Sequence, residues 1–214
     1  IPTFYRLSRL LKKQKIDYIF TPHGSFTEMA MSKNKWLKKW YFHYFEASLI
    51  REAKRNQLLG IPEYEYLDHL TQQAHKCLIP NGQDLAAIPS FPTRYRSKTT
   101  PTFGFCGRLA TFHKGLDLMF RGWQIYRQRG GLGRLELIGD GKDRIDLEHL
   151  SKRLGIEKSV IFHGKKFGGE KFVLLDQMDV FLHTSRMEGF PTAVLEAAAM
   201  DKTTINSEAT NIKN

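Results

Sequence analysis

The sequence predicts an α/β protein built on parallel β-sheets and divided into two domains. Helical and strand-like patterns alternate along the 214 residues, which is typical of parallel sheets because a crossover helix joins successive strands. The segment 88–101 interrupts this alternation with three prolines and three basic residues, and we interpret it as a linker. We therefore expect one domain over residues 1–98, with the linker from about residue 88, and a second domain over residues 99–214.

The individual elements are predicted from the spacing of apolar residues. Apolar side chains that recur every three to four residues indicate helices, and short apolar runs bounded by turn residues indicate strands. Helices are expected at 3–15, 35–57, 62–74, 114–129, 143–154 and 191–200. Strands are expected at 17–21, 76–80, 102–106, 134–138, 160–163, 179–183 and 203–206.

The two predicted domains differ in charge. Residues 1–98 contain 16 Lys and Arg against 8 Asp and Glu, a net charge of +8. Residues 99–214 contain 17 against 14, a net charge of +3. A basic half favours an anionic partner, such as membrane lipid, nucleic acid or a phosphorylated substrate. No run of about 18 apolar residues predicts a transmembrane helix.

The most informative segment is EGFPTAVLE, residues 188–196, which follows a strand-like run. Pro191 suits the first turn of the helix that comes next. Glu188, the bare backbone of Gly189 and a helix N-terminus therefore meet at the carboxyl end of a strand, where α/β sheets bind ligands and helix termini attract phosphates. Glu196 lies about one turn into the helix. We expect the two carboxylates to hold different parts of one long ligand rather than act as an acid/base pair.

Two cations, Arg108 and Lys114, flank a loop that we expect to be exposed between a strand and a helix. Arg grips phosphate through its planar fork, Lys acts as a point charge, and Gly107 and Gly115 let the backbone come close. Fixed cations at this position would stabilise negative charge on a phosphate group. The alternative is an ordinary loop with two solvated cations.

A histidine, His23, precedes Gly24 after the strand predicted at 17–21. A histidine in this place can donate to a substrate hydroxyl or carbonyl, and the alternative is a capping or core histidine. The other seven histidines show no metal-ligand spacing such as HExxH, and we interpret them as structural or surface residues.

The helix expected from residue 35 onward combines aromatic and basic side chains. Its apolar residues recur on one broad stripe, and four lysines crowd its start. Basic and aromatic residues on one amphipathic helix are typical of an interfacial membrane contact. The equal alternative is that the stripe belongs to the core and the lysines form a solvated edge. The residues assigned to a membrane contact are Lys33, Lys35, Trp36, Lys38, Lys39 and Trp40.

The segment 188–196 resembles the Glu-x7-Glu signature of retaining glycosyltransferases of the GT-B fold, glycosyltransferase family 4. Further stretches resemble family segments in the family's order: DYIFTPHGSF (17–26), CLIPNGQDL (77–85), FGFCGRLATFHKGLDLMF (103–120), LELIGDGKDRIDLEHL (135–150) and VIFHGKK (160–166). The resemblance implies two Rossmann-like domains with parallel sheets that face a cleft. Because family members are much longer, we expect both domains to be incomplete here.

The resemblance also implies roles for individual residues. Arg108 and Lys114, with Gly107, would hold the diphosphate of the donor. Glu196 would hold the ribose, and His23, with Gly24, would face the transferred sugar from the other domain. The sugar and its phosphate would be held by Glu188 and by the backbone of Gly189, Phe190, Pro191 and Thr192. The residues expected to be catalytic are His23 and Glu188. No metal is expected, because the cations and the helix terminus neutralise the leaving group.

The implied reaction is transfer of a glycosyl unit from a UDP- or GDP-linked sugar to an acceptor hydroxyl, with retained anomeric configuration and no cofactor besides the donor. The expected acceptor is a growing glycan or a lipid-linked acceptor in cell-surface glycan synthesis. We expect a cytoplasmic protein, peripheral on an anionic membrane surface at the inner face of the plasma membrane. The alternatives are a GT-B sugar-nucleotide epimerase and a non-catalytic nucleotide-sugar or membrane-binding module.

Other classes fail on motif spacing. The chain contains no Asp-x-Asp pair, which argues against a metal-dependent GT-A transferase, and no GxxxxGK[ST] phosphate loop. The IGDG run at 138–141 lacks the third glycine of a dinucleotide fingerprint, and no nucleophile elbow is present. No recognition motif supports nucleic acid as a partner.

Overall fold

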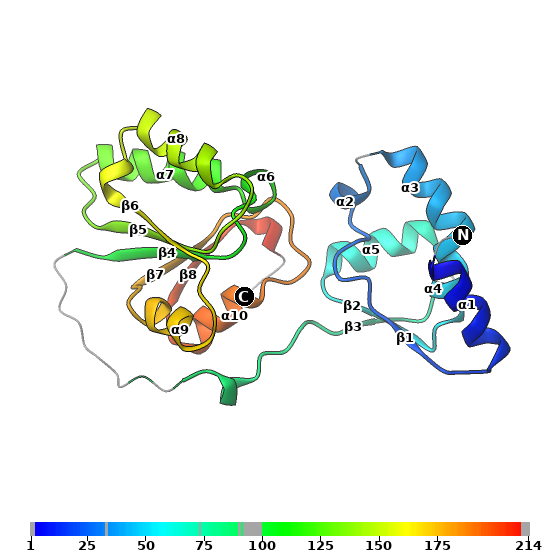
Figure 1. Cartoon of the computed structure of the whole chain (residues 1–214). Helices are drawn as coiled ribbons and strands as arrows, with labels where there is room; N and C mark the ends of the chain where they lie inside the picture. The colour runs from blue at the N-terminus through cyan, green and yellow to red at the C-terminus, as the bar shows by residue number, and fades with distance from the viewer. Residues whose placement is uncertain (1–2, 33, 73, 90, 92–99, 211–214) are drawn as a thin grey trace. The chain divides into compact units, whose positions relative to one another are not determined.

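The computed structural model describes residues 3–32, 34–72, 74–89, 91 and 100–210. Contacts between residues divide the chain into two units, Ile1–Asn81 and Gly82–Asn214 (Figure 1). Each unit contains one parallel sheet, so the predicted α/β class with parallel sheets is confirmed. Residues 90 and 92–99 of the predicted linker lie outside the described residues.

The first unit has a three-stranded sheet in the order β1-β2-β3. Its elements are α1 (Thr3–Lys13), β1 (Ile19–Phe20), α2 (Glu28–Ser32), α3 (Lys35–Tyr41), a π-helical turn (Phe42–Glu46), α4 (Ala47–Glu52), β2 (Arg55–Leu58), α5 (Ile61–Leu70) and β3 (Lys76–Leu78). The buried core of this unit includes Phe26, Phe42, Ile50, Leu58 and Leu67.

The single helix predicted at 35–57 is wrong, because the central strand of this sheet lies inside that range. The helix ends at Glu52, and Ala53 turns the chain into extended backbone. Strand β2 then pairs with both β1 and β3, and the amide of its buried Asn56 donates to the carbonyls of Ile50 and His75. The sequence RNQL has no β-branched or aromatic residue, so tertiary pairing rather than local propensity makes it a strand.

The second unit has a five-stranded parallel sheet in the order β6-β5-β4-β7-β8. Its strands are β4 (Thr102–Cys106), β5 (Arg134–Ile138), β6 (Val160–Gly164), β7 (Val180–His183) and β8 (Thr203–Asn206). Its α-helices are α6 (Thr111–Lys114), α7 (Leu116–Gln128), α8 (Arg144–Arg153), α9 (Gly168–Asp176) and α10 (Thr192–Ala199). Short 3-10 turns lie at Leu85–Ala87, Glu157–Ser159 and Glu208–Thr210.

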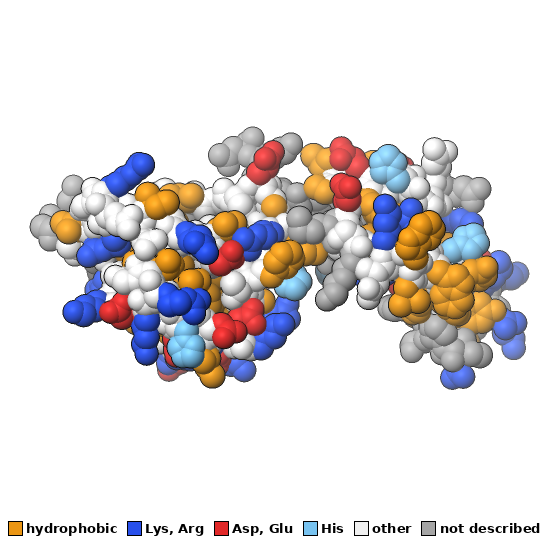
Figure 2. All heavy atoms as spheres, turned by 90° about the horizontal axis from the view of Figure 1, so that it is seen from above, with side chains coloured by type: hydrophobic (Ala, Val, Ile, Leu, Met, Phe, Trp, Pro, Cys, Tyr) orange, Lys and Arg blue, Asp and Glu red, His pale blue; other side chains and the backbone are white. Residues whose placement is uncertain are grey.

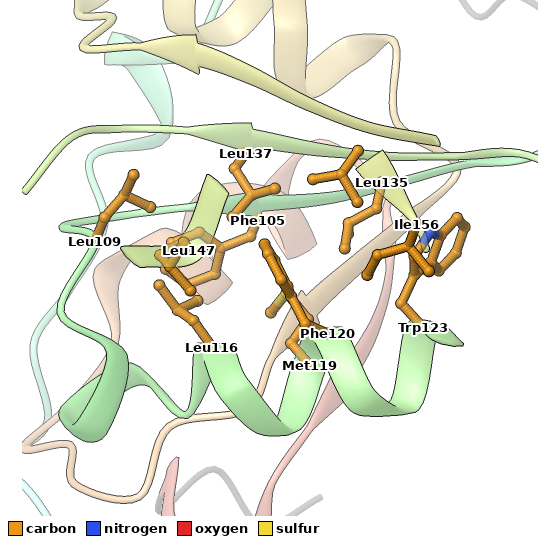
Figure 3. Packing of buried hydrophobic residues seen from close by; sticks show 11 residues of the cluster. Phe105, Leu109, Leu116, Met119, Phe120, Trp123, Leu135, Leu137, Leu147 and Ile156 are labelled. Atoms are coloured by element: carbon orange, nitrogen blue, oxygen red, sulfur yellow. The ribbon is translucent and has the colours of Figure 1, made fainter. Parts of the chain in front are cut away.

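Helices cover both faces of this sheet, α7 and α8 on one and α9 and α10 on the other (Figure 1). Figure 3 shows the side chains of α7 pointing toward the sheet, where Leu116, Phe120 and Trp123 pack against Phe105 and Leu135. The buried residues of α7 recur at helical spacing because one stripe of the helix faces the sheet. Each fully buried side chain of this kind stabilises the fold by about 1.5–3 kcal/mol.

Two helices of this unit differ from the prediction. The helix expected at 114–129 is α7, which begins only at Leu116, because Gly115 adopts a left-handed conformation with φ 59° and separates it from the unpredicted short helix α6. Helix α9 was not predicted, since it begins with Gly168 and Gly169, which are poor helix formers. It forms because Phe172 and Leu175 are buried against the sheet.

Candidate functional site

The sheet of the second unit has a topological switch point beside β4. The chain continues from β4 to β5 and β6 on one side and then returns to β7 and β8 on the other. Connections that leave in opposite directions open a crevice at the carboxyl ends of the strands, where α/β proteins bind ligands. A pocket of about 530 Å³ lies at these strand ends, lined by residues that follow β4, β5 and β6 and by residues of α9 and α10.

The pocket carries an excess of positive charge. Arg108, Lys165, Lys166 and Lys171 line it, and its acidic residues are Asp140 and Glu196. Thr192, the first residue of α10, adds a helix N-terminus to the same wall. Cations and a helix N-terminus together favour an anionic ligand.

The floor of this pocket is formed by direct backbone packing. The Gly-Asp-Gly turn after β5 lies against the loop after β4, and the amide of Leu109 donates to the carbonyl of Asp140. A Cβ at Gly139, whose φ is 136°, would lie 1.9 Å from the carbonyl oxygen of Gly107. A glycine is therefore required at 139 for the two loops to meet.

A second group of residues forms around Glu188. Lys114, the last residue of α6, places its Nζ 2.7 and 2.9 Å from the two carboxylate oxygens of Glu188. The chain turns at Gly115 between α6 and α7. At this turn the hydroxyl of Thr184, just after β7, donates to the carbonyls of Lys114 and Gly115, which holds the end of α6 near the loop that carries Glu188. The Lys114 side chain is only 17% exposed and that of Glu188 12%, so Lys114 does not lie on an exposed loop as expected.

The same carboxylate also meets a buried histidine. Burial alone would raise the pKa of Glu188, but hydrogen bonds from His183 and Lys114 and the charge of Lys114 outweigh it and lower that pKa. His183 places Nε2 3.5 Å from Oε1 of Glu188 and 3.1 Å from Oγ of Ser185. Its Nδ1 is buried without a hydrogen-bond partner among the described residues. We assign the proton to Nε2, because an unpaired buried lone pair is more common than an unpaired buried N–H.

The loop that carries Glu188 is braced against α7. The guanidinium of Arg186 donates to both carboxylate oxygens of Asp117, at 2.7 and 2.8 Å. The hydrogen bonds from Arg186 lower the pKa of Asp117. Neither Arg186 nor His183 was singled out from the sequence, and Arg186 could have been noticed only as a charge beside Glu188.

The second carboxylate of the signature has a lysine of its own. Lys171, in α9, places Nζ 2.7 Å from Oε1 of Glu196, in α10. Both residues line the pocket, and their side chains are 19% and 16% exposed. Nothing in the sequence indicated this pair, because its members are 25 residues apart on different helices.

The structure therefore distributes the predicted donor residues over two places. Gly107, Arg108, Thr192 and Glu196 line the pocket, and Arg108 is exposed. Lys114 and Glu188 form the ion pair described above. The half-buried Gly189 and Phe190 and the buried Pro191 connect that pair to the start of α10.

The predicted residues of the first unit lie in a tight loop after β1. His23 is exposed, with φ 53°, a conformation uncommon outside glycine, and Gly24 follows with φ 82°. The amides of Gly24 and Leu59 donate to the two carboxylate oxygens of the buried Glu63, which fixes the loop to the chain after β2. Burial raises the pKa of Glu63, although these hydrogen bonds oppose the shift. The role expected for His23 toward a sugar stays a prediction.

The stripe on α3 and the π-helical turn is divided between core and surface. Phe42 is buried, whereas Leu37, Tyr44, Trp40 and Trp36 are exposed, Trp36 by 88%. Figure 2 shows hydrophobic side chains gathered with basic ones on this end of the first unit. Lys35 and Lys39 are exposed, Lys38 is half-buried and donates to the carbonyl of Ala30, and Lys33 lies outside the described residues.

Two searches of the described residues bear on membranes and metals. None of the helices they form is both long and apolar enough to cross a membrane. They contain no group of three or more His, Cys, Asp or Glu side chains placed to hold a metal ion. The expectation that no metal takes part stays a prediction.

A parallel sheet with helices on both faces and a cationic pocket at its switch point is typical of a Rossmann-like nucleotide-binding domain. The solved structures that the chain resembles place this fold in the GT-B class. The chain belongs to the glycosyl transferases group 1 family, whose sequence model matches residues 100–214.

Similar proteins agree with this membership. The chain is 24% identical over 194 residues to an uncharacterized glycosyltransferase of Methanocaldococcus jannaschii, covering 87% of this chain and 46% of that protein. HepE of Anabaena in complex with UDP superposes with a TM-score of 0.79 and 17% identity, covering 97% of this chain and 58% of that one. The lipopolysaccharide outer core galactosyltransferase WaaB gives 0.67 and 25%, covering 96% and 60%. The chain thus spans about half the length of these relatives.

Proposed function

We propose that the protein transfers a glycosyl unit from a UDP- or GDP-linked sugar to an acceptor hydroxyl, with retained anomeric configuration and without a metal. The single observation that carries this proposal is the pocket at the switch point of the second unit, which Arg108, the start of α10 and Glu196 help to line. A nucleoside diphosphate matches these groups, because it offers an anion to the cations and ribose hydroxyls to the carboxylate.

The Lys114–Glu188 pair supports a catalytic role for these two residues. When the sugar bond breaks, negative charge develops on the departing diphosphate, and a fixed ammonium stabilises that charge in the transition state. Retention and metal independence rest on the resemblance of residues 188–196 to the Glu-x7-Glu signature. The complex of HepE with UDP supports a uridine nucleotide as the first donor to test.

Donor binding is tested by a thermal-shift screen of nucleotide sugars on the full-length protein, followed by calorimetry with UDP and GDP. Arg108→Ala should weaken binding of the nucleoside diphosphate by about 1.5–3 kcal/mol, the range for charge-assisted hydrogen bonds. Arg121→Ala is the matched control, because Arg121 is an exposed arginine of α7 that does not line the pocket. Equal affinity of the Arg108 variant and wild type would refute the assignment.

The reaction itself is tested by analysing the product. Transfer requires a new glycosidic bond to an added acceptor, with the anomeric configuration of the donor preserved. An epimerised sugar nucleotide, or donor binding without turnover in the full-length protein, would instead favour one of the two alternatives. Full activity after exhaustive chelation would support metal independence, and restoration by an added divalent cation would contradict it.

The acceptor is proposed to be a glycan or a lipid-linked acceptor at the cytoplasmic face of the plasma membrane. This proposal is supported by the exposed aromatic side chains of α3, chiefly Trp36 and Trp40, beside Lys35 and Lys39. Aromatic and basic residues on one exposed helix suit the interface of an anionic bilayer, where the rings enter the headgroup region and the ammonium groups meet lipid phosphates.

A further inference from the structure

The ion pair between Lys171 and Glu196 lines the pocket, and both side chains are largely buried. Its partners come from α9 and α10, which cover the same face of the sheet (Figure 1). Lys171 engages Oε1 of Glu196 at 2.7 Å, and its Nζ also lies 4.5 Å from the centre of the Phe172 ring. The lysine is thus held on two sides, by a carboxylate and by an aromatic face.

This pair would reduce an electrostatic repulsion that arises in a pocket binding a nucleotide-sugar donor. A carboxylate that accepts ribose hydroxyls carries a negative charge, and that charge repels the diphosphate of the same ligand. A lysine at 2.7 Å cancels most of the charge at a distance while it occupies only Oε1. Oε2 of Glu196 would then remain to accept from a ligand in the pocket that Glu196 lines.

The free carboxylate would behave differently. The same pocket contains Arg108, Lys165 and Lys166. Without Lys171, Glu196 could pair with one of these cations and remove it from the diphosphate. Because such pairing depends on side-chain rotation, the cost would fall on nucleotide binding rather than on the fold.

We propose that Lys171 is a positioning residue that orients Glu196 toward the ribose and neutralises it against the diphosphate. The inference rests on the proposed function, because it requires a nucleoside diphosphate in this pocket. It adds a determinant of donor affinity, and of preference for an intact ribose, that the signature residues do not include.

The test is a double-mutant cycle on the full-length protein, read by calorimetry with UDP, or with GDP if the screen selects it. Lys171→Met should weaken binding by about tenfold, close to the lower end of the range for hydrogen bonds to charged groups. In a Glu196→Gln background the same change should have little further effect, because no carboxylate remains to misplace. Wild type should prefer the ribonucleotide over its 2′-deoxy and 3′-deoxy forms, and Lys171→Met should lose most of this preference.

The control is Lys202→Met. Lys202 is similarly buried, donates to the backbone and carboxylate of Asp176 in the same unit, and does not line the pocket. It should leave nucleotide affinity unchanged. If wild type binds neither nucleotide, the proposed function fails and this inference falls with it. If wild type binds and Lys171→Met binds equally well, or if the Lys171 and Glu196 effects simply add, the positioning role alone is overturned.

Discussion

Glu188 and Glu196 are held by different lysines in different surroundings. Lys114 engages both oxygens of Glu188, and His183 lies against one of them. Lys171 engages one oxygen of Glu196 at the wall of the pocket. Each carboxylate is thus paired with a different lysine, and we expect their removal to have different consequences.

We predict that Glu188→Gln mainly lowers turnover, whereas Glu196→Gln mainly weakens donor binding. The physical reason is that Glu188 pairs with Lys114, the cation expected to stabilise the negative charge that develops on the departing diphosphate. Glu196 instead lines the pocket expected to bind the nucleotide. Steady-state kinetics should show kcat lowered by about tenfold for Glu188→Gln and KM for the donor raised by about tenfold for Glu196→Gln. Identical kinetic profiles for both variants would mean that the carboxylates act as one unit.

A pH dependence follows from the lowered pKa of Glu188. A carboxyl group whose folded-state pKa lies below its ordinary 4.5 contributes stability that is present above 4.5 and is lost as pH falls through the folded value. Lys114→Met leaves Glu188 buried without its cation, so its pKa should rise. The free energy of unfolding at neutral pH should fall by about 2–4 kcal/mol, near the range for a broken buried pair.

Denaturant unfolding at neutral pH and again below pH 4.5 measures this effect. The gap between wild type and Lys114→Met should narrow at the lower pH, because Glu188 is then protonated in the variant. Lys12→Met, which breaks the exposed pair of Lys12 with Glu52, should change stability by less than about 1 kcal/mol. A gap that stays constant with pH would contradict the coupling.

One element boundary decides where Lys114 points. Helix α6 ends at Lys114 and α7 begins at Leu116, with the left-handed Gly115 between them. If α6 and α7 formed one continuous helix, Lys114 would lie along the axis of α7, and its carbonyl could not accept from the hydroxyl of Thr184. The break thus brings Lys114, which pairs with Glu188, into hydrogen-bond contact with the residue that follows β7.

Two glycine substitutions test this boundary. A Cβ at Gly115 would lie 2.0 Å from the carbonyl oxygen of Thr184, and φ is positive, so Gly115→Ala should destabilise the protein by roughly 1–3 kcal/mol. Gly122 is the matched control within α7, where an added Cβ meets nothing within 4 Å. Gly122→Ala should stabilise by about 0.5–1 kcal/mol, because alanine favours helix interiors. Thermal unfolding of both variants gives the two signs, and a stabilising Gly115→Ala would contradict the packing.

Over the whole chain, positive charge is concentrated in the first half. Residues 1–98 carry a net charge of +8, and α3 adds exposed aromatic side chains to it. Each basic residue near an anionic bilayer contributes about 1 kcal/mol, fading beyond a Debye length of about 8 Å in physiological salt. The net positive charge and the exposed aromatic side chains together predict a reversible, peripheral contact with an anionic membrane.

We predict co-sedimentation with anionic vesicles but not with neutral ones, weakened by added salt. Changing Lys33, Lys35, Lys38 and Lys39 to Gln together should abolish it and leave donor binding intact. The charge-matched control changes four exposed residues of the second unit to Gln, Lys142, Lys152, Arg153 and Lys158. Failure of wild type to sediment with anionic vesicles at low salt would point to a soluble acceptor, and equal loss in both variants would mean that net charge alone drives binding.

The sequence predicted the fold class and most of the second sheet, because its strands are short runs rich in apolar and β-branched residues between turn residues. The strands at 102–106, 134–138 and 203–206 match their predicted bounds. It was wrong at 55–58, where RNQL has no strand signal of its own and becomes the central strand by pairing on both sides. Local pattern cannot report a preference that arises only from neighbouring strands.

The candidate site divides in the same way. The sequence by itself determined that Arg108, Lys114 and Glu188 lie in segments that follow predicted strands and that Glu196 lies in the helix after one of them, since strand ends, helix starts and glycine turns are local features. Only the tertiary structure decided that each carboxylate has its own lysine and that His183 meets one of them. These pairs join segments 25 and 74 residues apart, and the order of strands in the sheet, which no local pattern encodes, brings them together.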